Sequence, residues 1–132
     1  MTTQLPPLRA GGDIGTCRFI KVSTAADNTA LEADAGEFVI GISTEAAKAA
    51  PTDGASTEAA ESGDQFEWYG MGNVALLTIG SGGCTRGDHL KSDADGQGVT
   101  ASAGDKYGAI ALESASAGEK AKVYIVVGEL ET

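Results

Sequence analysis

Two segments of this chain carry the same succession of β-strand features. Residues 19–69 (the first repeat) and 90–124 (the second repeat) each open with an apolar strand that has a central lysine, Lys21 or Lys91. In both, a glycine followed by an acidic residue then precedes each of two further strands: Gly36-Glu37 and Gly63-Asp64 in the first, Gly104-Asp105 and Gly118-Glu119 in the second. Neither unit has enough strands to bury an apolar face alone, so the two must pack together. The sequence therefore predicts an all-β, compact barrel-like or sandwich-like domain, which favours a scaffold over a catalyst.

The chain length predicts one domain, since 132 residues can bury a single hydrophobic core. We expect an extended N-terminal arm over residues 1–14 and a β-domain over 15–132. A low-complexity stretch at 44–62 has no counterpart in the second repeat and is expected to be a long surface loop, with one or two helical turns possible at 45–50. The predicted strands cover residues 18–22, 29–33, 37–43, 65–69, 73–79, 88–91, 99–102, 106–113 and 121–127. Alternation in the last strand predicts a core face with Ala121, Val123, Ile125 and Val127 and a partly solvated face with Lys120, Lys122, Tyr124 and Val126.

The charge balance excludes several partners. With 19 acidic and 9 basic residues the net charge is −10, which disfavours phosphate backbones and anionic lipid, because both need clustered Lys and Arg. The first residues lack the basic and apolar regions of a signal peptide, and no apolar run is long enough to span a bilayer. We expect synthesis in a cytoplasm, with no nucleic acid and no membrane as partner.

Two cysteines, Cys17 and Cys84, each stand just before the lysine-bearing strand of a repeat. Fold symmetry could bring them together, so a disulfide or a metal pair stays open as an alternative. In a reducing compartment two buried thiols are the favoured interpretation.

The residues that could support catalysis or metal binding are few. His89 is the only histidine and follows Asp88, without a nucleophile motif or a phosphate loop. Residues 93–96, Asp-Ala-Asp-Gly, resemble the start of a calcium loop but lack its distal ligands, so a hairpin turn is the better interpretation. The adhesion-like triplet at 86–88 fits a turn that leads into a strand. We therefore predict no enzyme activity, no cofactor and no metal site.

The aromatic residues cluster in one place. Phe66, Trp68 and Tyr69 are close in sequence, and Met71 follows them. Large rigid side chains dominate many protein contacts, so Trp68, Tyr69 and Met71 are candidates for an oligomer or partner interface. Core packing is an equal alternative for Phe66 and Trp68, whereas alternation puts Tyr69 on the opposite face and makes it the better contact candidate.

The start of the chain is the other candidate contact. It is a partly apolar peptide that its two prolines stiffen, and it consists of Leu5, Pro6, Pro7, Leu8 and Arg9. An extended peptide of this kind can lie in a partner's groove or add to a sheet edge. A disordered tail is the alternative.

Three stretches of the second repeat, at 86–96, 107–113 and 117–123, resemble the capsid cement (head decoration) proteins of tailed bacteriophages. Residues 18–22 and 38–42 are similar to the opening of the same family, so the resemblance covers residues 12–127. It implies a non-enzymatic protein of the virion that binds the outer surface of the icosahedral head and bridges subunits of the major capsid protein. It also implies a homo-oligomer, with a trimer as the family-level expectation.

A second function stays open from the sequence. A β-module on a virion fibre or spike could bind carbohydrate or a host surface, although such a site needs solvent-facing aromatic side chains along a groove. The chain has three Tyr and one Trp, which are few for such a groove.

Overall fold

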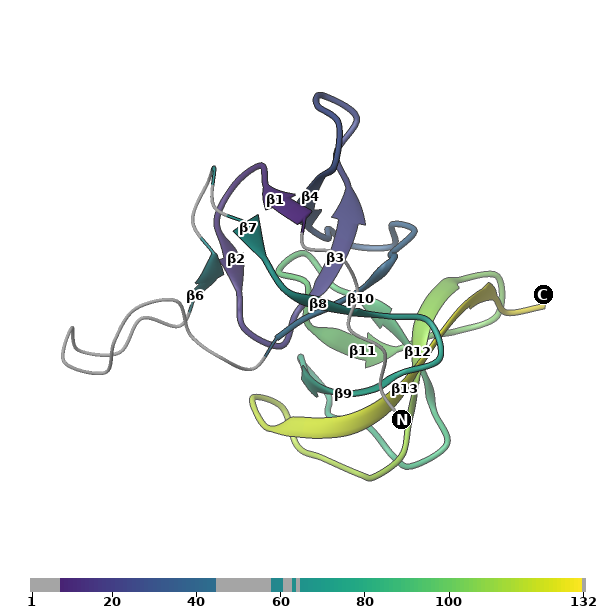
Figure 1. Ribbon diagram of the computed structural model, residues 1–132. Coiled ribbons are helices and arrows are strands. Elements are labelled where there is room, and N and C mark those ends of the chain that lie inside the picture. Colours follow the sequence, from purple (N-terminus) through teal and green to yellow (C-terminus); the bar gives the residue numbers. More distant parts are fainter. Residues whose placement is uncertain (1–7, 45–57, 61–62, 64, 132) are drawn as a thin grey trace, which may run out of the picture.

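The structure, a computed structural model, describes residues 8–44, 58–60, 63 and 65–131. Throughout these residues the regular elements are all strands, which confirms the predicted all-β class (Figure 1). The strands are β1 (Leu8–Ala10), β2 (Ile14–Gly15), β3 (Phe19–Val22), β4 (Thr29–Glu32), β5 (Gly41–Ser43), β6 (Glu58–Ala60), β7 (Gln65–Phe66), β8 (Trp68–Gly70), β9 (Val74–Thr78), β10 (His89–Ser92), β11 (Gly98–Thr100), β12 (Lys106–Ala111) and β13 (Lys120–Glu129).

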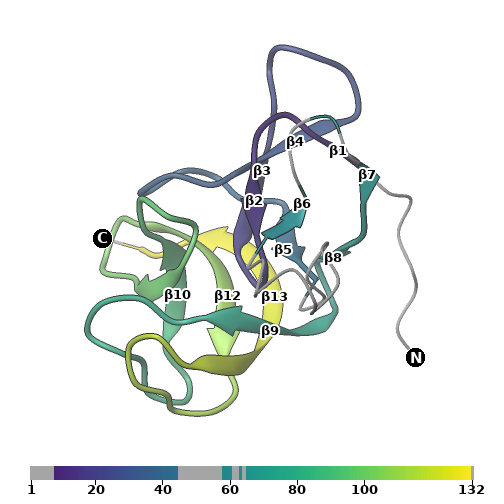
Figure 2. The ribbon, with the colours of Figure 1, turned by 90° about the vertical axis from the view of Figure 1, so that its left-hand side faces the viewer.

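These strands form two main sheets. The first sheet has the order β7-β1-β4-β3-β5-β8, the second has the order β11-β10-β12-β13-β9, and β2 and β6 make a small third pair. Figures 1 and 2 show the purple and blue strands of the first sheet on one side and the green and yellow strands of the second on the other. The turn between β8 and β9 connects the two sheets along the chain.

The two repeats adopt the same local topology. In the first sheet β4, β3, β5 and β8 are consecutive neighbours, and in the second sheet β11, β10, β12 and β13 are. All six of these pairings are antiparallel. Equivalent residues also keep the same cross-strand register: Lys21–Leu31 matches Lys91–Val99, and Ile42–Tyr69 matches Ile110–Tyr124.

One hydrophobic core is shared by the two sheets. Most of its buried members come from β3 and β5 of the first repeat and from β9, β10, β12 and β13 of the second sheet; the others, Ala33, Val39, Ile79 and Cys84, lie in the segments between strands. The fully buried large side chains among them are Phe19, Ile42, Leu77, Ile79, Leu90, Val123 and Ile125. Burying this surface from both sheets at once stabilises the pair, because the gain scales with the apolar area removed from water. Neither sheet has this core by itself.

The first sheet is buried on both faces. Successive side chains of β3 point to opposite faces, so Phe19 enters the shared core while Ile20 enters a second cluster. That cluster also contains Ile14, Ala30 and Phe66. The second sheet has no equivalent cover among the described residues: Lys122 and Tyr124 on β13 are exposed, and the alternating Ala121, Val123 and Ile125 are buried.

A turn of the second repeat, at Asp95 and Gly96, is hydrogen-bonded to Arg18 and Phe19 of the first half. The carbonyl of Gly96 accepts a hydrogen bond from the N–H of Phe19 at 2.8 Å, and the carbonyl of Asp95 accepts one from Nη1 of Arg18, also at 2.8 Å. Gly96 has a positive φ of 76° and no room for a Cβ, which would approach the Glu32 side chain to 2.9 Å. The tight turn therefore requires glycine at this position.

Several predicted elements differ from the structure. The strand predicted at 37–43 is only Gly41–Ser43, because its neighbour β8 ends at Gly70, whereas the equivalent β12 is paired along its length by the longer β13. The strand predicted at 65–69 is interrupted at Glu67. Within the predicted loop at 44–62, β6 pairs with β2; the possible helical turns at 45–50 lie outside the described residues.

The N-terminal segment also differs from the prediction of an arm over residues 1–14. Leu8–Ala10 form β1, which pairs in parallel with β4 and antiparallel with β7. Ala10 and Ile14 are buried in the second cluster. The described part of this segment is thus a strand of the domain, because its backbone and apolar side chains both find partners there; residues 1–7 lie outside the described residues.

Substituting Gly108 tests the contact between the repeats. Gly108 lies at the bulge of β12, and a Cβ there would overlap the side chain of Val39 and come within 2.9 Å of the Phe19 ring. We expect Gly108→Ala to lower the free energy of unfolding by about 1–3 kcal/mol, as overpacking does, when measured by chemical denaturation. Gly12→Ala is the control, because its Cβ would meet only Leu31 at 3.6 Å. Equal stabilities of the two variants would contradict this account of the core.

Candidate functional site

The structure separates the predicted N-terminal contact residues. Leu8 is half-buried and packs against the second cluster, while Arg9 on the same strand is exposed. Leu5, Pro6 and Pro7 lie outside the described residues. Of the predicted peptide, the side chain of Arg9 is therefore the part that the described structure leaves accessible.

The predicted aromatic cluster is divided between the two cores. Phe66 is buried, Trp68 packs against the second cluster and Tyr69 packs against the shared core. The predicted alternation of Trp68 and Tyr69 between opposite faces is confirmed, but the face of Tyr69 is the one that packs against the shared core, so Tyr69 is not more open to a partner than Trp68. Met71, in the turn that follows, is 63% exposed and is the residue of this group that is most available to a partner.

The outer face of the second sheet carries an apolar surface that the sequence analysis did not identify. Residues directly opposite one another in a sheet point to the same side, and Tyr124 lies between Ile110 on β12 and Val74 on β9. In the next row Lys122 lies opposite Leu76, and its carbonyl accepts a hydrogen bond from the N–H of Leu112. We call Val74, Leu76, Ile110, Leu112, Lys122 and Tyr124 the outer face.

Three apolar members of the outer face are largely open to solvent. Val74 is 50% exposed, Leu112 is 48% exposed and Tyr124 is 41% exposed. Scattered single apolar residues on a surface are normal, but neighbours on adjacent strands make a patch, and such patches mark interaction sites. Alternation in the strand predicted at 121–127 placed Tyr124 on the solvent-exposed face. Its cross-strand neighbours could not be predicted, because they come from distant parts of the chain.

The lysine of each repeat has a structural role. Nζ of Lys21 lies 2.7 Å from the Glu37 carboxylate, and Nζ of Lys91 lies 2.8 Å from the Asp105 carboxylate. Each carboxylate also accepts a hydrogen bond from the backbone N–H three positions before it. The pair thus fixes the turn that leads into β5 or β12, which explains why lysine and the glycine-acid pair recur together.

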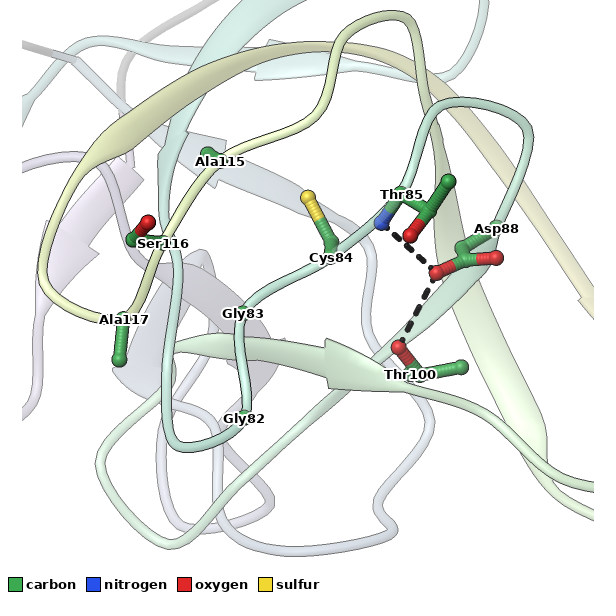
Figure 3. Close-up of a pocket in the computed structure, with 9 residues that line it drawn as sticks. All are labelled: Gly82, Gly83, Cys84, Thr85, Asp88, Thr100, Ala115, Ser116 and Ala117. Carbon is green, nitrogen blue, oxygen red and sulfur yellow. Dashed lines mark hydrogen bonds between the residues drawn. The ribbon is translucent and has the colours of Figure 1, made fainter.

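A polar cavity of about 310 Å³ lies beside Cys84, between the segment that precedes β10 and the loop at 115–117 (Figure 3). Asp88 is the acidic group in its wall. One oxygen of its carboxylate accepts hydrogen bonds from the N–H of Thr85 at 2.9 Å and from the hydroxyl of Thr100 at 3.2 Å, drawn as dashed lines in Figure 3. Asp88 therefore closes a turn and ties it to β11, which is a structural use of the carboxylate.

The cysteines are two separate buried thiols. Neither Cys17 nor Cys84 forms a disulfide. Burial raises the pKa of the Cys84 thiol, and Sγ lies 3.6 Å from the carbonyl oxygen of Glu113. A raised pKa keeps the thiol protonated and unreactive, as in a packed interior.

His89 and the acidic turn also have structural explanations. The His89 ring makes an edge-on contact with Tyr107 at 4.6 Å between centroids. One oxygen of the Asp93 carboxylate accepts hydrogen bonds from the N–H groups of Asp95 and Gln97, which closes the predicted hairpin turn. Within the described residues no cluster of three or more His, Cys, Asp or Glu could hold a metal ion.

The search for membrane-spanning helices gave none among the residues that the structure describes.

Comparison with known proteins identifies the fold. No protein-family model matches the sequence, and no curated protein sequence matches it. Among solved structures, the N base of the head fiber gp8.5 in bacteriophage phi29 is similar, with a TM-score of 0.69 over 100% of both chains and 20% sequence identity. This chain therefore shares the all-β fold of a phage head fiber base.

The lysine–carboxylate pair of the second repeat leads to a prediction about pH. The hydrogen bond from Lys91, and after it the one from the Ser102 N–H, lowers the pKa of Asp105 from its ordinary value. A carboxylate with a depressed folded-state pKa stabilises the fold above its unfolded pKa, and this contribution is lost as the pH falls through the folded pKa. Asp105→Asn should therefore lower the melting temperature at neutral pH, and the gap to the wild type should close as the pH falls through the acid range in which the Asp105 carboxylate becomes protonated.

Thermal unfolding followed across the acid range measures this gap. Asp27→Asn is the control, because the Asp27 side chain is exposed and makes no hydrogen bond or ion pair within the described residues. A gap for Asp105→Asn that persists unchanged into strong acid would show that the carboxylate charge is not what stabilises the turn.

Proposed function

We propose that this protein is a structural component of a phage virion that binds the outer surface of the assembled head and stabilises it by bridging major capsid protein subunits. The observation that carries the proposal is the end-to-end similarity to a head fiber base, which leaves no part of either chain unmatched. The resemblance of the second repeat to capsid cement proteins was found independently, from the sequence.

The physical properties of the molecule support a binding role. A shell protein is present in many copies, so a weak contact repeated over the shell stabilises the whole assembly by mass action. The outer face offers exposed apolar side chains for such a contact, with Tyr124 at its centre. Burying them against a partner would remove apolar surface from water in the same way as the shared core does.

Self-association is part of the proposal, with a trimer as the expected form. Closed symmetric oligomers are the usual way in which a small domain presents several equal contacts to a symmetric shell. Met71 is the best exposed candidate for a contact with another copy or with the shell. Trp68 and Tyr69 would contribute through the parts of their side chains that the cores leave open, and residues 5–9 through the start of the chain.

The alternative is a carbohydrate-binding or host-binding module on a virion fibre or spike. Its specific support is that the similar structure belongs to a head fiber. Such a module needs aromatic rings gathered along one groove. The most exposed aromatic residues within the described ranges do not share a sheet, since Phe38 lies in the segment before β5 and Tyr124 lies on β13, which favours the shell-binding proposal.

Binding to shells is the direct test. Purified protein mixed with empty shells of the major capsid protein should co-sediment with expanded shells and much less with precursor shells, because the bridged geometry exists only after expansion. Equal binding to both forms would remove the stabilising role. Absence of binding to either, together with tight binding on a glycan array, would favour the alternative.

Deleting residues 1–7 tests the start of the chain as a contact. This deletion ends before β1, so it retains the hydrogen bonds of β1 to β4 and β7, which a deletion of residues 1–12 would remove. We expect an unchanged melting temperature and reduced occupancy of shells, measured by sedimentation. Full occupancy by the shortened protein would show that these residues do not contribute to binding.

A further inference from the structure

We propose that β9, the edge strand of the second sheet, receives an extended segment of the shell protein, which adds to this sheet as a further strand. This inference rests on the proposed function and identifies where and how the partner binds. It is carried by three observations: unpaired backbone groups on β9, an uncharged edge, and a cavity with a neighbouring lysine.

The hydrogen-bond pattern of β9 leaves half of its backbone groups pointing outward. Ile79 donates its N–H to the carbonyl of Glu119, and Ile125 donates its N–H to the carbonyl of Asn73. In an antiparallel ladder such hydrogen-bonded pairs alternate, so the odd-numbered residues of β9 bond to β13. The even-numbered residues, Val74, Leu76 and Thr78, therefore direct their N–H and carbonyl groups away from β13.

Only the end of this outward row is used within the described chain. The N–H of Thr78 donates to the carbonyl of Cys17 at 2.8 Å, which confirms the outward direction. The backbone groups of Val74 and Leu76 that point the same way have no hydrogen-bond partner among the residues that the structure describes. Two donors and two acceptors are thus arranged at the spacing that an added strand requires.

The composition of β9 makes this edge unusual. Exposed edges are normally protected by short length, by charged side chains or by proline, because unpaired backbone groups attract other strands. β9 has five residues, Val-Ala-Leu-Leu-Thr, with no charge and no proline, whereas the edge strands β7, β8 and β11 have two or three residues. β9 is therefore the longest edge strand of the two main sheets, and it has neither a charged side chain nor a proline to protect it.

The side chains around this edge would receive those of an added strand. A cavity of about 200 Å³ lies along it, lined by Tyr69, Val74, Ala75, Leu76 and Lys122. On the outer face, an added residue opposite Val74 would extend the row formed by Ile110, Tyr124 and Val74. An apolar side chain is expected at that position, since it would cover Val74 and part of Tyr124.

Charge defines the second feature of the partner segment. Lys120 and Lys122 are exposed on β13, beside β9, and the ammonium groups of both lack an ion pair within the described part of the chain. A carboxylate on the added strand would lie on the far side of β9 from Lys122, at a backbone separation of roughly 10 Å, which a lysine and a glutamate side chain can span together across the sheet. The segment that fits is extended, apolar opposite Val74, and acidic near Lys122.

A second copy of this chain fits the same edge poorly. Pairing of β9 with β9 of another copy would place Lys120 and Lys122 of both copies on one joined sheet, and the two molecules each carry a net charge of −10. Repulsion among these lysines and repulsion between two molecules of equal net charge both oppose self-association through this edge. A segment of the shell protein is therefore the occupant that we assign.

Blocking the edge tests the inference. Leu76→Pro removes an outward N–H that makes no bond to β13, and prolines are tolerated on edge strands. Thr100→Pro is the control on the opposite edge of the same sheet, where the N–H of Thr100 also points outward from β10; because it also removes the hydroxyl bond to Asp88, its melting temperature is measured beside that of Leu76→Pro. Leu76→Pro should weaken binding to expanded shells by about tenfold, and Thr100→Pro should leave it unchanged.

A charge reversal decides the question if Leu76→Pro does not fold, as judged by its melting temperature. Lys122→Glu should weaken shell binding by about tenfold at low salt, with a smaller effect at high salt, because the lost contact is electrostatic. Lys106→Glu, an equal charge change on β12 away from β9, should have no such effect.

The outcomes separate the inference from the proposed function. If the wild type binds expanded shells and the β9 variants bind equally well, or no worse than their controls, the edge is not the contact and the inference is overturned. If Leu76→Pro reduces the mass of the purified oligomer, the edge joins copies of this chain, which also overturns it. If the wild type does not bind shells, the proposed function is lost and the inference with it.

Discussion

The packing of Phe19 and Val39 against the second sheet at Gly108 is the contact on which the rest of the structure depends. It exists because the second sheet has a glycine where the first sheet presents an aromatic ring, so the two halves approach closely. Each repeat contributes too little apolar surface for an independent core. The shared core therefore makes one domain from two similar units, and it sets the direction in which every remaining face points.

That arrangement explains why the two repeats, although similar in topology, present different surfaces. The far face of the first sheet is covered by the second cluster, to which its own strands β1, β3, β4 and β7 contribute together with Ile14 of β2. The second sheet has no such cover among the described residues and keeps Val74, Leu112 and Tyr124 in solvent. The added N-terminal strands thus leave one repeat enclosed and the other available to a partner.

Local patterns were the predictable part. Alternation correctly placed Ala121, Val123 and Ile125 inside and Lys122 and Tyr124 outside, because side-chain direction in a strand depends only on neighbouring residues. The turn at 93–96 was equally recognisable from its Asp and Gly residues. Strand length could not be predicted in the same way, as the short β5 shows. How far a strand continues depends on its partner, and β8 ends before residues 37–40 can pair with it.

The candidate site belonged mostly to the part that could not be predicted. Met71 was recognised as a candidate from its neighbours in sequence, but the row of Ile110, Tyr124 and Val74 joins residues up to 50 positions apart. The sequence by itself determined the all-β class, the duplication, and the lysine and glycine-acid pair that recur in each repeat, since these depend on short-range spacing. Only the tertiary structure decided that Leu8–Ala10 belongs to a sheet and that β9 ends one, because a strand becomes an edge through the pairings that distant segments make or leave unmade.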